Sequence, residues 1–526
     1  MHTTIPSVLT DDCGLGRRHN GHADPNDLSA QAAADSEAIP LAAFEVQPEA
    51  DQGGPAETNG KPKRKRRRRK QQPDSDGNGK LSSEKIDAVP VASAYLASTQ
   101  RDGVPRLRYY RGIWLAWRAG AYRELPPSVI QGCLVDALDR RYSRLTKAAV
   151  ANVLMGLQAK ARLPHDMEPP AWIGDDAPPW DLADVLLTKD GIVHLPTLVA
   201  DSPEYMRPAT PRLFAQSALD YGFRPDAPRP DVLLQFLEQL WPGDSDSIST
   251  LQEWCGYCLT PDTRQQKILM LVGPKRSGKG TIARLLRATI GKQNVAGPTL
   301  ASLGTNFGLW PLIGKSLAII SDARLGGRTD SQIVVERLLS ISGEDALTID
   351  RKNLEPLTCK LPTRLMILSN ELPRLGDSSG ALASRMILLR LRESFYGRED
   401  HDLSEKLLAE LPSILLWSIE GWRRLRERRH FRQPDSALEM LGDFTDLASP
   451  VTAFLHEKCN VGPQHEIPRH DLFAAYCEWA KANGRKYIED EAGFGRDLRA
   501  ALPALVDPQH RVGGRPVRFY GGVGLS

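Results

Sequence analysis

The chain has 526 residues, which is too long for one hydrophobic core and predicts about two to four domains. Hydrophobic residues make up 41% and charged residues 25%, as in ordinary globular proteins, and no stretch approaches the roughly 20 consecutive apolar residues that span a bilayer. Nothing after Met1 resembles a signal peptide, and seven scattered cysteines exclude a disulfide framework, so we expect a cytoplasmic protein without membrane contact.

Residues 1 to about 85 are rich in Gly, Pro, Ala, Asp, Asn and Gln and poor in aromatic residues, which predicts a disordered tail. The segment Lys61–Lys70 contains nine positive charges, whereas the net charge of the whole chain is +3, so the remainder is net acidic. Two interpretations of this basic run stay open. It is a phosphate-binding arm or localisation signal, which we favour, or a solvated charge run without a specific role.

Residues 92–235 predict an α+β accessory domain. Tyr109–Trp117 and Ala121–Leu125 predict a small sheet, residues 127–142 a helix, and Leu187–Leu195 a hairpin that turns at Asp190-Gly191. We interpret the aromatic residues of this domain as core residues, because no catalytic pattern accompanies them.

Cys255-Gly-Tyr-Cys258 resembles a thioredoxin-type redox motif. A redox motif of this kind follows a strand at the start of a helix, where the first thiol is exposed and its pKa falls. Here both cysteines lie inside a helical pattern, from Ile248 to Leu259, and share one face. We therefore expect them to pack in the core.

The strongest chemical signal is a glycine-rich loop between a strand and a helix. The apolar run Ile268–Val272 predicts a buried parallel strand, and Ile282–Ile290 has helical periodicity. Between them the spacing G-x-x-x-x-G-K predicts a P-loop, in which Lys279 contacts the β and γ phosphates of ATP. The predicted ATP-binding residues are Gly273, Pro274, Lys275, Arg276, Ser277, Gly278, Lys279, Gly280 and Thr281.

Gly280 stands where P-loops usually have the Ser or Thr that binds Mg²⁺, and Thr281 follows it. We expect the Thr281 hydroxyl to contact the α phosphate or to reach the metal indirectly. A second metal-binding group is Asp322, which ends the apolar strand predicted over Leu317–Asp322. Asp322 is expected beside the P-loop, where it binds Mg²⁺ or activates water.

A third strand, Arg364–Ser369, ends at Asn370, whose amide is suited to orienting the attacking water or sensing the γ phosphate. Between the second and third strands we expect a helix over Ser331–Ile341 and then a hairpin with Arg351 and Lys352 near its tip. Contact with DNA phosphates and an ordinary solvated turn are equally compatible with this tip.

The order of these motifs resembles the A, B, B′ and C motifs of superfamily 3 helicases. The segments Ser369–Arg385, Leu251–Thr260 and Asp190–Leu195 are similar to the phage and plasmid primase-helicase branch, and the resemblance covers roughly residues 105–430. This similarity implies an α/β, AAA+-like P-loop motor with a parallel sheet, acting as an ATP-dependent DNA helicase of a phage, prophage or plasmid in the cytoplasm of a bacterial host. Residues 236–400 would form the ATPase domain and 401–449 a helical extension.

The resemblance also implies a hexamer around DNA, with ATP at subunit interfaces and an arginine from the neighbouring subunit completing each site. Arg385 matches the position of that arginine, and Arg374 is the substitute. The hairpin would direct Arg351 and Lys352 into the channel. The B motif often has two acidic residues, whereas only Asp322 is present here, which leaves the catalytic base unidentified. Because no zinc-ribbon cysteine set or catalytic carboxylate cluster is found in the N-terminal half, we expect priming by a separate primase.

Residues 450–526 predict a small C-terminal module. Three helical patterns (451–459, 470–482 and 491–502) and the ribbon Val512–Tyr520 resemble a winged helix. Its arginines Arg496, Arg499, Arg515 and Arg518 are candidates for DNA contact, and a packing module with solvated arginines is the alternative.

Two other functions remain possible from the sequence. A nucleotide kinase is one, because Gly-Lys-Gly-Thr also ends the P-loops of adenylate-kinase type enzymes. The other is an origin-binding protein whose ATP site controls assembly without unwinding.

Overall fold

The computed structural model describes residues 80–82, 86–174, 177–324, 330–377, 380–484 and 488–526. The predicted tail, with the basic run 61–70, lies outside the described residues. Among those that are described, no helix is both long and apolar enough to cross a membrane.

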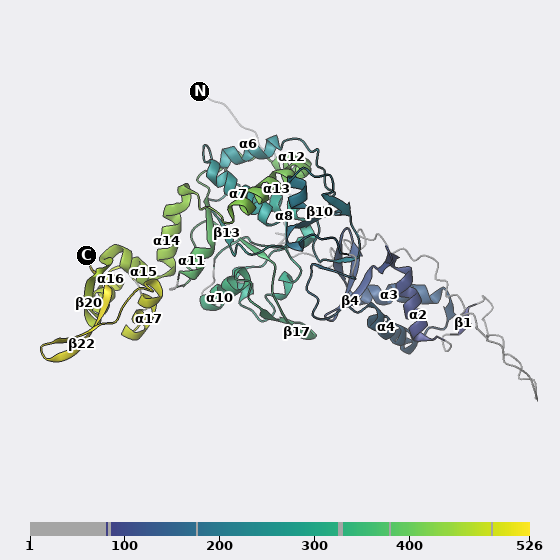
Figure 1. Ribbon diagram of the computed structural model, residues 1–526, viewed down its shortest axis with the longest axis horizontal. Coiled ribbons are helices and arrows are strands. Elements are labelled where there is room, and N and C mark those ends of the chain that lie inside the picture. Colours follow the sequence, from purple (N-terminus) through teal and green to yellow (C-terminus); the bar gives the residue numbers. More distant parts are fainter. Residues whose placement is uncertain (1–79, 83–85, 175–176, 325–329, 378–379, 485–487) are drawn as a thin grey trace, which may run out of the picture.

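A five-stranded parallel sheet forms the centre of the molecule (Figure 1). Its strands, in the spatial order β14-β15-β18-β13-β19, are β14 (Val295–Ala296), β15 (Leu317–Ile320), β18 (Arg364–Ser369), β13 (Ile268–Val272) and β19 (Met386–Arg390). Every residue of β13 and β18 is buried, as expected for parallel strands that are covered on both faces. This finding confirms the predicted parallel α/β sheet.

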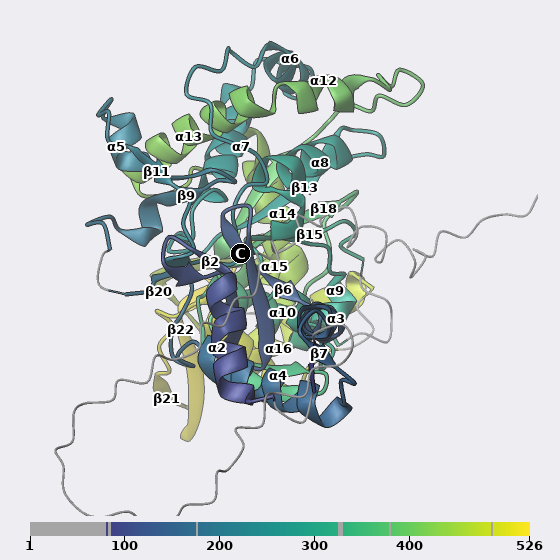
Figure 2. The ribbon, with the colours of Figure 1, turned by 90° about the vertical axis from the view of Figure 1, so that its right-hand side faces the viewer.

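The alternation of side chains along β13 divides the core into two layers. Leu269 and Leu271 pack on one side, and Ile268 and Met270 on the other. On the first side lie α6 (Asp231–Leu240), α7 (Ser245–Tyr257), α8 (Lys279–Ile290), α12 (Leu403–Ala409) and α13 (Leu411–Arg428), which Figure 2 shows stacked together. On the second side lie α9 (Leu300–Leu303), α10 (Ser331–Ser342), α11 (Ala381–Arg385) and α14 (Leu438–Ala448).

The helices α7 and α13 approach each other closely because both have a glycine at the contact. A Cβ atom on Gly256 would stand 2.3 Å from the backbone nitrogen of Trp422, and one on Gly421 would stand 2.2 Å from the carbonyl oxygen of Gln252. The predicted boundary at residue 235 falls inside α6, and α13, from the predicted helical extension, shares its core with the sheet.

The accessory region contains the predicted small sheet and the predicted hairpin. The sheet consists of β4 (Leu107–Tyr110), β5 (Ile113–Arg118) and β6 (Ala121–Leu125), and it packs with α2 (Ala88–Ser98), α3 (Pro127–Asp139) and α4 (Lys147–Ala161). The hairpin pairs β9 (Val185–Leu187) with β10 (Gly191–His194), and β11 (Met206–Pro208) extends it. Short elements complete the region: β1 (Leu81–Ser82), β7 (Tyr142–Ser143), β2 (Gln100–Arg101), β3 (Val104–Pro105), β8 (Ala171–Trp172), β12 (Leu213–Phe214) and α5 (Leu195–Val199).

Side chains of the accessory region contact α8, the helix that begins at the P-loop, and the turn that follows it. The Arg123 guanidinium donates to the Asn294 side-chain oxygen in that turn at 2.7 Å and, within the accessory region, to the carbonyl oxygen of Ala218 at 3.1 Å. The Tyr221 hydroxyl donates to the carbonyl oxygen of Thr289 at 2.8 Å. Burial lowers the pKa of Arg123 to about 10. The contacts with Asn294 and Thr289 attach the accessory region directly to the part of the chain that contains the five-stranded sheet.

The C-terminal module lies at one end of the molecule, beyond α14 (Figure 1). In chain order it contains α15 (Pro450–Lys458), β20 (Cys459–Pro468), α16 (Arg469–Ala482), α17 (Glu491–Ala501), β21 (Gln509–Val512) and β22 (Arg515–Leu525). The three predicted helices and the predicted ribbon are present, and β20, which was not predicted, adds the third strand of the sheet β20-β22-β21. Phe454, Tyr476 and Phe494 form a core of its own.

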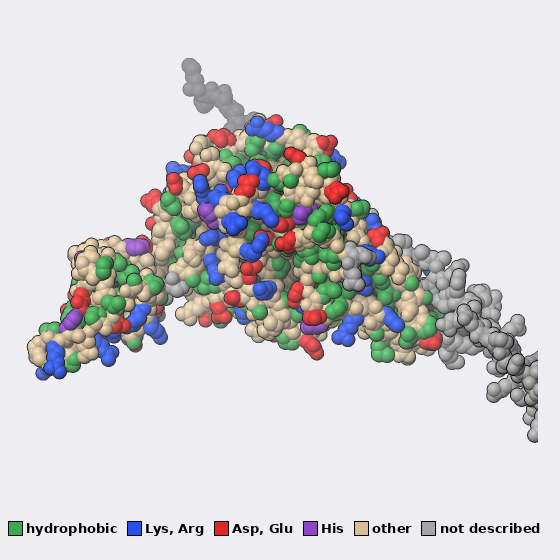
Figure 3. Space-filling view, in the orientation of Figure 1, with side chains coloured by type: hydrophobic (Ala, Val, Ile, Leu, Met, Phe, Trp, Pro, Cys, Tyr) green, Lys and Arg blue, Asp and Glu red, His purple; other side chains and the backbone are tan. Residues whose placement is uncertain are grey.

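The outer part of the β21–β22 ribbon, residues 509–518, is mostly exposed and has an excess of positive charge. Arg511, Arg515 and Arg518 are exposed, and no acidic residue occurs in 508–526. Figure 3 shows blue side chains at the outer end of the module. Arg499, in contrast, donates to the Asp507 carboxylate at 3.1 Å and to the carbonyl oxygen of Gly495 at 2.8 Å. Arg499 is therefore bound within the module, whereas the ribbon arginines face solvent.

Candidate nucleotide-binding site

The predicted P-loop occupies the connection between the end of β13 and the start of α8. Gly278 is the N-cap of α8 and has a φ of +90°, and Arg276 has a φ of +60°. These left-handed conformations turn the chain sharply, so that the N-terminus of the helix opens onto the loop. A helix N-terminus with free backbone N–H groups is suited to binding phosphate.

Two glycines are required here by close packing. A Cβ atom on Gly273 would stand 2.5 Å from the carbonyl oxygen of Leu391. A Cβ atom on Gly278 would stand 2.8 Å from the side chain of Leu240, on α6. The loop is thus supported on one side by the chain after β19 and on the other by α6.

The Lys279 side chain folds back over the loop. Its ammonium group donates to the carbonyl oxygens of Gly273 and Pro274, both at 2.7 Å, and lies 3.2 Å from the Ser277 hydroxyl. Burial lowers the pKa of Lys279. The Lys279 ammonium group therefore lies against the backbone carbonyl groups at the start of the loop. Bound phosphates would replace these carbonyl partners.

The segment after β19 contacts the outside of the loop, which the sequence did not indicate. The Ser394 hydroxyl donates to the carbonyl oxygen of Lys275 at 2.8 Å, and the Phe395 backbone N–H donates to that of Arg276 at 2.9 Å. Glu399 stands 3.6 Å from the Arg276 guanidinium. This second layer of contacts fixes the conformation of the loop from outside.

Thr281 lies on the first turn of α8, and its hydroxyl accepts a hydrogen bond from Arg284 at 3.0 Å. It also lines a hollow of about 390 Å³ between α8 and α12. Leu285, Ala288 and Leu407 supply apolar walls to this hollow. Gly280, which precedes Thr281, is exposed.

Asp322 follows β15 at the carboxyl edge of the sheet, and half of its side chain is exposed to solvent. The Arg324 guanidinium donates to both oxygens of the Asp322 carboxylate. Its Nη2 lies 2.6 Å from Oδ2, and its Nε lies 3.0 Å from Oδ1. These hydrogen bonds hold the pKa of Asp322 below its usual value. The carboxylate is ionised and accessible, as a metal ligand must be.

The strand order corrects one expectation. Asp322 was expected directly beside the P-loop, but β18 lies between β15 and β13. The neighbour of the P-loop is therefore the end of β18, where the Gly273 backbone N–H donates to the carbonyl oxygen of Ser369 at 3.2 Å. Asn370 comes next in the chain and is exposed. The structure thus places Asn370 between the P-loop and Asp322.

Glu371 is a carboxylate at the same edge that the sequence analysis missed. It follows Asn370 and is exposed. The pKa of Arg324 is raised, first by Asp322 and also by attraction to Glu371, so Glu371 lies near the Asp322–Arg324 pair. The sequence signal that could have identified Glu371 is its position directly after Asn370, the polar residue at the end of the third predicted strand. Glu371 is therefore a second carboxylate at the edge of the sheet where Asp322 lies.

Arg385 lies at the other edge of the sheet. It ends α11, and the next residue, Met386, pairs with Ile268 at the start of β13. Its guanidinium contacts the carbonyl oxygen of Leu339 and, at 2.9 Å, the Ser342 hydroxyl. With the full length of a strand between them, Arg385 and the P-loop of the same chain do not meet. Arg374 is exposed.

The predicted hairpin is confirmed as β16 (Leu347–Arg351) and β17 (Leu354–Cys359). Lys352 is exposed at its turn, but Arg351 is buried, which differs from the expected exposed position near the tip. The Arg351 guanidinium donates to the carbonyl oxygen of Glu355 at 2.8 Å and to that of Arg111 at 2.7 Å. Arg351 therefore joins the hairpin to the accessory region.

Cys255 and Cys258 are both buried in α7 and the residue after it. Burial raises the pKa of both thiols, that of Cys258 to about 12. A thiol that stays protonated is a poor nucleophile. The pair packs in the core, as the sequence pattern indicated.

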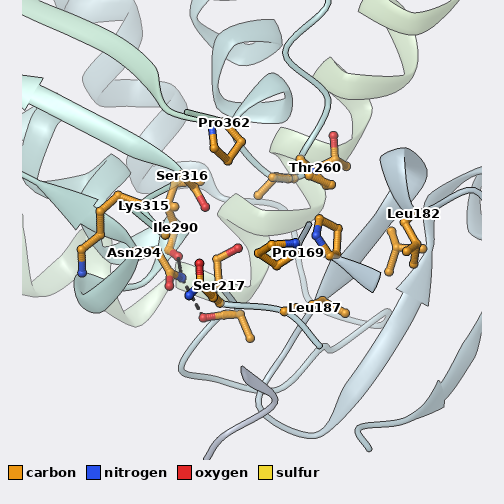
Figure 4. Close-up of a pocket in the computed structure, with 18 of the residues that line it drawn as sticks. Pro169, Leu182, Leu187, Ser217, Thr260, Ile290, Asn294, Lys315, Ser316 and Pro362 are labelled. Atoms are coloured by element: carbon orange, nitrogen blue, oxygen red, sulfur yellow. Dashed lines mark hydrogen bonds between the residues drawn. The ribbon is translucent and has the colours of Figure 1, made fainter. Parts of the chain in front are cut away.

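A separate cavity of about 90 Å³ lies at the opposite edge of the sheet from the P-loop (Figure 4). Its walls come from the accessory region, including Pro169 and Ser217, and from residues that precede β15 and β18, including Lys315 and Pro362. It is remote from Lys279 and is no part of the nucleotide site.

Comparison with known proteins gives two likenesses. Residues 271–385 match a family described as a family of unknown function, DUF5906. The fold has a weak similarity to the C-terminal region of NrS-1 in apo structures. One has a TM-score of 0.43 at 12% identity, covering 79% of this chain and 97% of that chain; another has a TM-score of 0.44 at 14% identity, covering 80% and 96%. Neither likeness names an activity, so what the site does follows from its own residues.

Proposed function

We propose that this chain is an ATP-driven DNA helicase of the superfamily 3 type, acting as a ring in the replication of a phage, prophage or plasmid. The observation that supports this most is the convergence of Lys279, Asn370 and Asp322 at one edge of the parallel sheet. Each ends or follows a different strand, so a lysine, an amide and a carboxylate lie at the same edge of the sheet. This is the set that hydrolysis of a nucleoside triphosphate requires.

In this proposal the phosphates bind to the loop and to the N-terminus of α8. The backbone N–H groups of the loop bind the β and γ phosphates, and the Lys279 ammonium exchanges its carbonyl partners for phosphate oxygens. The hollow between α8 and α12 begins at Thr281 and has the volume of a small-molecule pocket. We assign the nucleoside of ATP to this hollow.

Mg²⁺ fits the donor set at this edge. Among the described residues no cluster of three or more metal-ligating side chains occurs. Mg²⁺ in ATPases is bound by one or two carboxylates, water and the phosphates, which Asp322 satisfies after release from Arg324. The ion would neutralise charge that develops on the β and γ phosphates.

Hydrolysis follows from the neighbouring groups. Asn370 orients a water molecule, and Glu371 accepts its proton as the water oxygen bonds to the γ phosphorus and the bond to the β-phosphate oxygen breaks. ADP then leaves with that oxygen. Arg385 cannot reach the P-loop of its own chain, so in this proposal it neutralises the transition state in the site of a neighbouring subunit, which requires a closed ring.

DNA contact is assigned to exposed cations. Lys352 at the turn of the hairpin faces outward, and the ribbon arginines Arg511, Arg515 and Arg518 are exposed in the C-terminal module. Such cations bind phosphates irrespective of sequence. Arg351 and Arg499 are excluded from this set, because their guanidinium groups are bound within the chain.

The experiment that tests the proposal measures the products of ATP turnover with and without single-stranded DNA. A DNA motor releases inorganic phosphate, and DNA accelerates that release. Transfer of phosphate to an added nucleoside monophosphate would identify a nucleotide kinase instead. Phosphate release that DNA leaves unchanged would favour an ATP-regulated binding protein.

A further inference from the structure

A second hollow, unrelated to the P-loop, lies on the accessory region. It has a volume of about 510 Å³ and is lined by residues from β2, β5 and the turns that follow β3, β5 and β9. The lining side chains that matter here are Arg101, Arg106, Trp117, Arg118, Lys189 and Asp190.

Backbone contacts fix the walls of this hollow. The Trp117 backbone N–H donates to the carbonyl oxygen of Arg106 at 2.7 Å, and the Arg106 N–H donates to that of Thr99 at 3.1 Å. Across the hollow, a Cβ atom on Gly120 would stand 2.2 Å from the carbonyl oxygen of Thr188, so the two turns are in direct contact. The cations therefore project from a rigid frame.

The charge of the lining is strongly positive. Four cations stand against one carboxylate, and Asp190 accepts a hydrogen bond from the Thr188 hydroxyl at 2.9 Å, within its own turn. Asp102, which does not line the hollow, stands 4.0 Å from the Arg101 guanidinium. Cations gathered in one concave surface attract anions.

Trp117 adds a hydrogen-bond donor. Its side chain is 4% exposed, and its indole Nε1–H has no acceptor in the part of the chain that the structure describes. A buried donor without an acceptor is destabilising. The Arg101 guanidinium lies 4.8 Å from the centre of the indole ring and covers it.

We propose that this hollow binds the phosphate groups of a single DNA strand. Its volume exceeds that of one phosphate and falls within the range of small-ligand pockets, so it accommodates a backbone segment. Because Trp117 is buried beneath Arg101, this aromatic residue has no free face for a base to stack on, and the site reads the backbone and not the sequence. The assignment gives the accessory region a DNA-binding role that is independent of ATP hydrolysis.

The test uses Lys189 as a reporter in the full-length chain. Its acetylation by an amine-reactive reagent is followed by peptide mass spectrometry, with an oligo-dT strand or inorganic pyrophosphate as the probe. Saturating oligo-dT should slow acetylation of Lys189 about tenfold. Lys160, exposed on α4 outside the hollow, is the internal control and should keep its rate. Protection by oligo-dT alone identifies a nucleic-acid strand as the ligand, and protection by both probes shows that a free phosphate suffices. Protection by neither probe overturns the proposal.

Variants separate the hollow from the rest of the protein. Arg101→Ala should weaken protection by oligo-dT about tenfold, whereas Arg101→Lys should retain most of it, because the side chain is half exposed and its charge is what binds. Protection that persists in Arg101→Ala, or is lost in Lys279→Ala, would contradict the assignment. Lys279→Ala removes hydrolysis and leaves the hollow intact, so failure of the helicase proposal and failure of this one give different results.

Discussion

The ammonium group of Lys279 donates to the carbonyl oxygen of Gly273, 2.7 Å away, at the mouth of the loop that follows β13. In the proposed function phosphate replaces this contact, and burial lowers the pKa of the lysine. The free protein therefore loses the Lys279 proton at a lower pH than a solvated lysine, whose pKa is about 10.4.

ATP affinity should accordingly decrease as pH rises through the lowered pKa of Lys279, because the neutral amine does not attract phosphate. Lys279→Arg, whose side chain stays charged, should show no such decrease. The measurement is an equilibrium titration with a fluorescent ATP analogue across the alkaline range. Parallel pH profiles for the two proteins would contradict the assigned role.

Arg324→Ala should lower the Mg²⁺ concentration needed for half-maximal hydrolysis. Arg324 competes with the metal for the Asp322 carboxylate, and both side chains are largely exposed, so thermal stability should not change. A Mg²⁺ titration of the hydrolysis rate checks this. An unchanged half-maximal concentration would show that Asp322 is not the metal ligand.

Glu371→Gln should lower the hydrolysis rate about 10²–10⁴-fold while ATP binding is retained, because the amide cannot accept the proton of water. The matched control is Glu336→Gln, which changes an exposed carboxylate on α10 and should leave the hydrolysis rate unchanged. The rate is compared with the affinity for ATP in each variant. Equal hydrolysis rates of Glu371→Gln and wild type would show that Glu371 is not the catalytic base.

Arg385→Ala should reduce hydrolysis about 10³–10⁵-fold if the arginine acts in a neighbouring site. A mixture of Arg385→Ala and Lys279→Ala chains should then recover activity, since some interfaces combine an intact P-loop with an intact arginine. A loss caused only by the contacts of Arg385 with Leu339 and Ser342 would not be restored by mixing. Hydrolysis measured over a series of mixing ratios therefore decides between a catalytic and a structural role of Arg385. The variant Arg374→Ala tests the alternative candidate in the same way.

Gly256→Ala should destabilise the protein by about 1–3 kcal/mol, because the new methyl group overlaps the backbone of α13 at Trp422. Gly442→Ala, in α14, meets no atom within 4 Å and should stabilise by about 0.5–1 kcal/mol. Chemical denaturation of both variants measures the difference. Equal stability of the two would contradict the close packing of α7 and α13.

The local patterns predicted the elements of the site but not their arrangement. Strand β13 and its loop follow from an apolar run and a fixed glycine spacing, which are properties of neighbouring residues. The position of β18 between β13 and β15 is a property of the whole sheet, and no local pattern encodes strand order. The expected neighbours Asp322 and the P-loop were therefore separated by Asn370.

Contacts with other segments explain the other differences. Arg351 looked like a free cation beside Lys352, but it is buried, and its partner Arg111 lies far away in the sequence, in the accessory region. Arg499 is exposed, but its guanidinium is bound by Asp507, eight residues later in the chain. A basic residue in a turn indicates exposure only when no other segment covers it, and that depends on tertiary contacts.

The central claim is that ATP hydrolysis at Lys279 drives DNA strand separation. Its most direct test is strand displacement on a forked duplex by wild type, Lys279→Ala and Lys160→Ala, the last an exposed lysine on α4, outside the candidate site. ATP-dependent displacement is expected for wild type and for Lys160→Ala, and none for Lys279→Ala. Hydrolysis by wild type without displacement of either strand would contradict it.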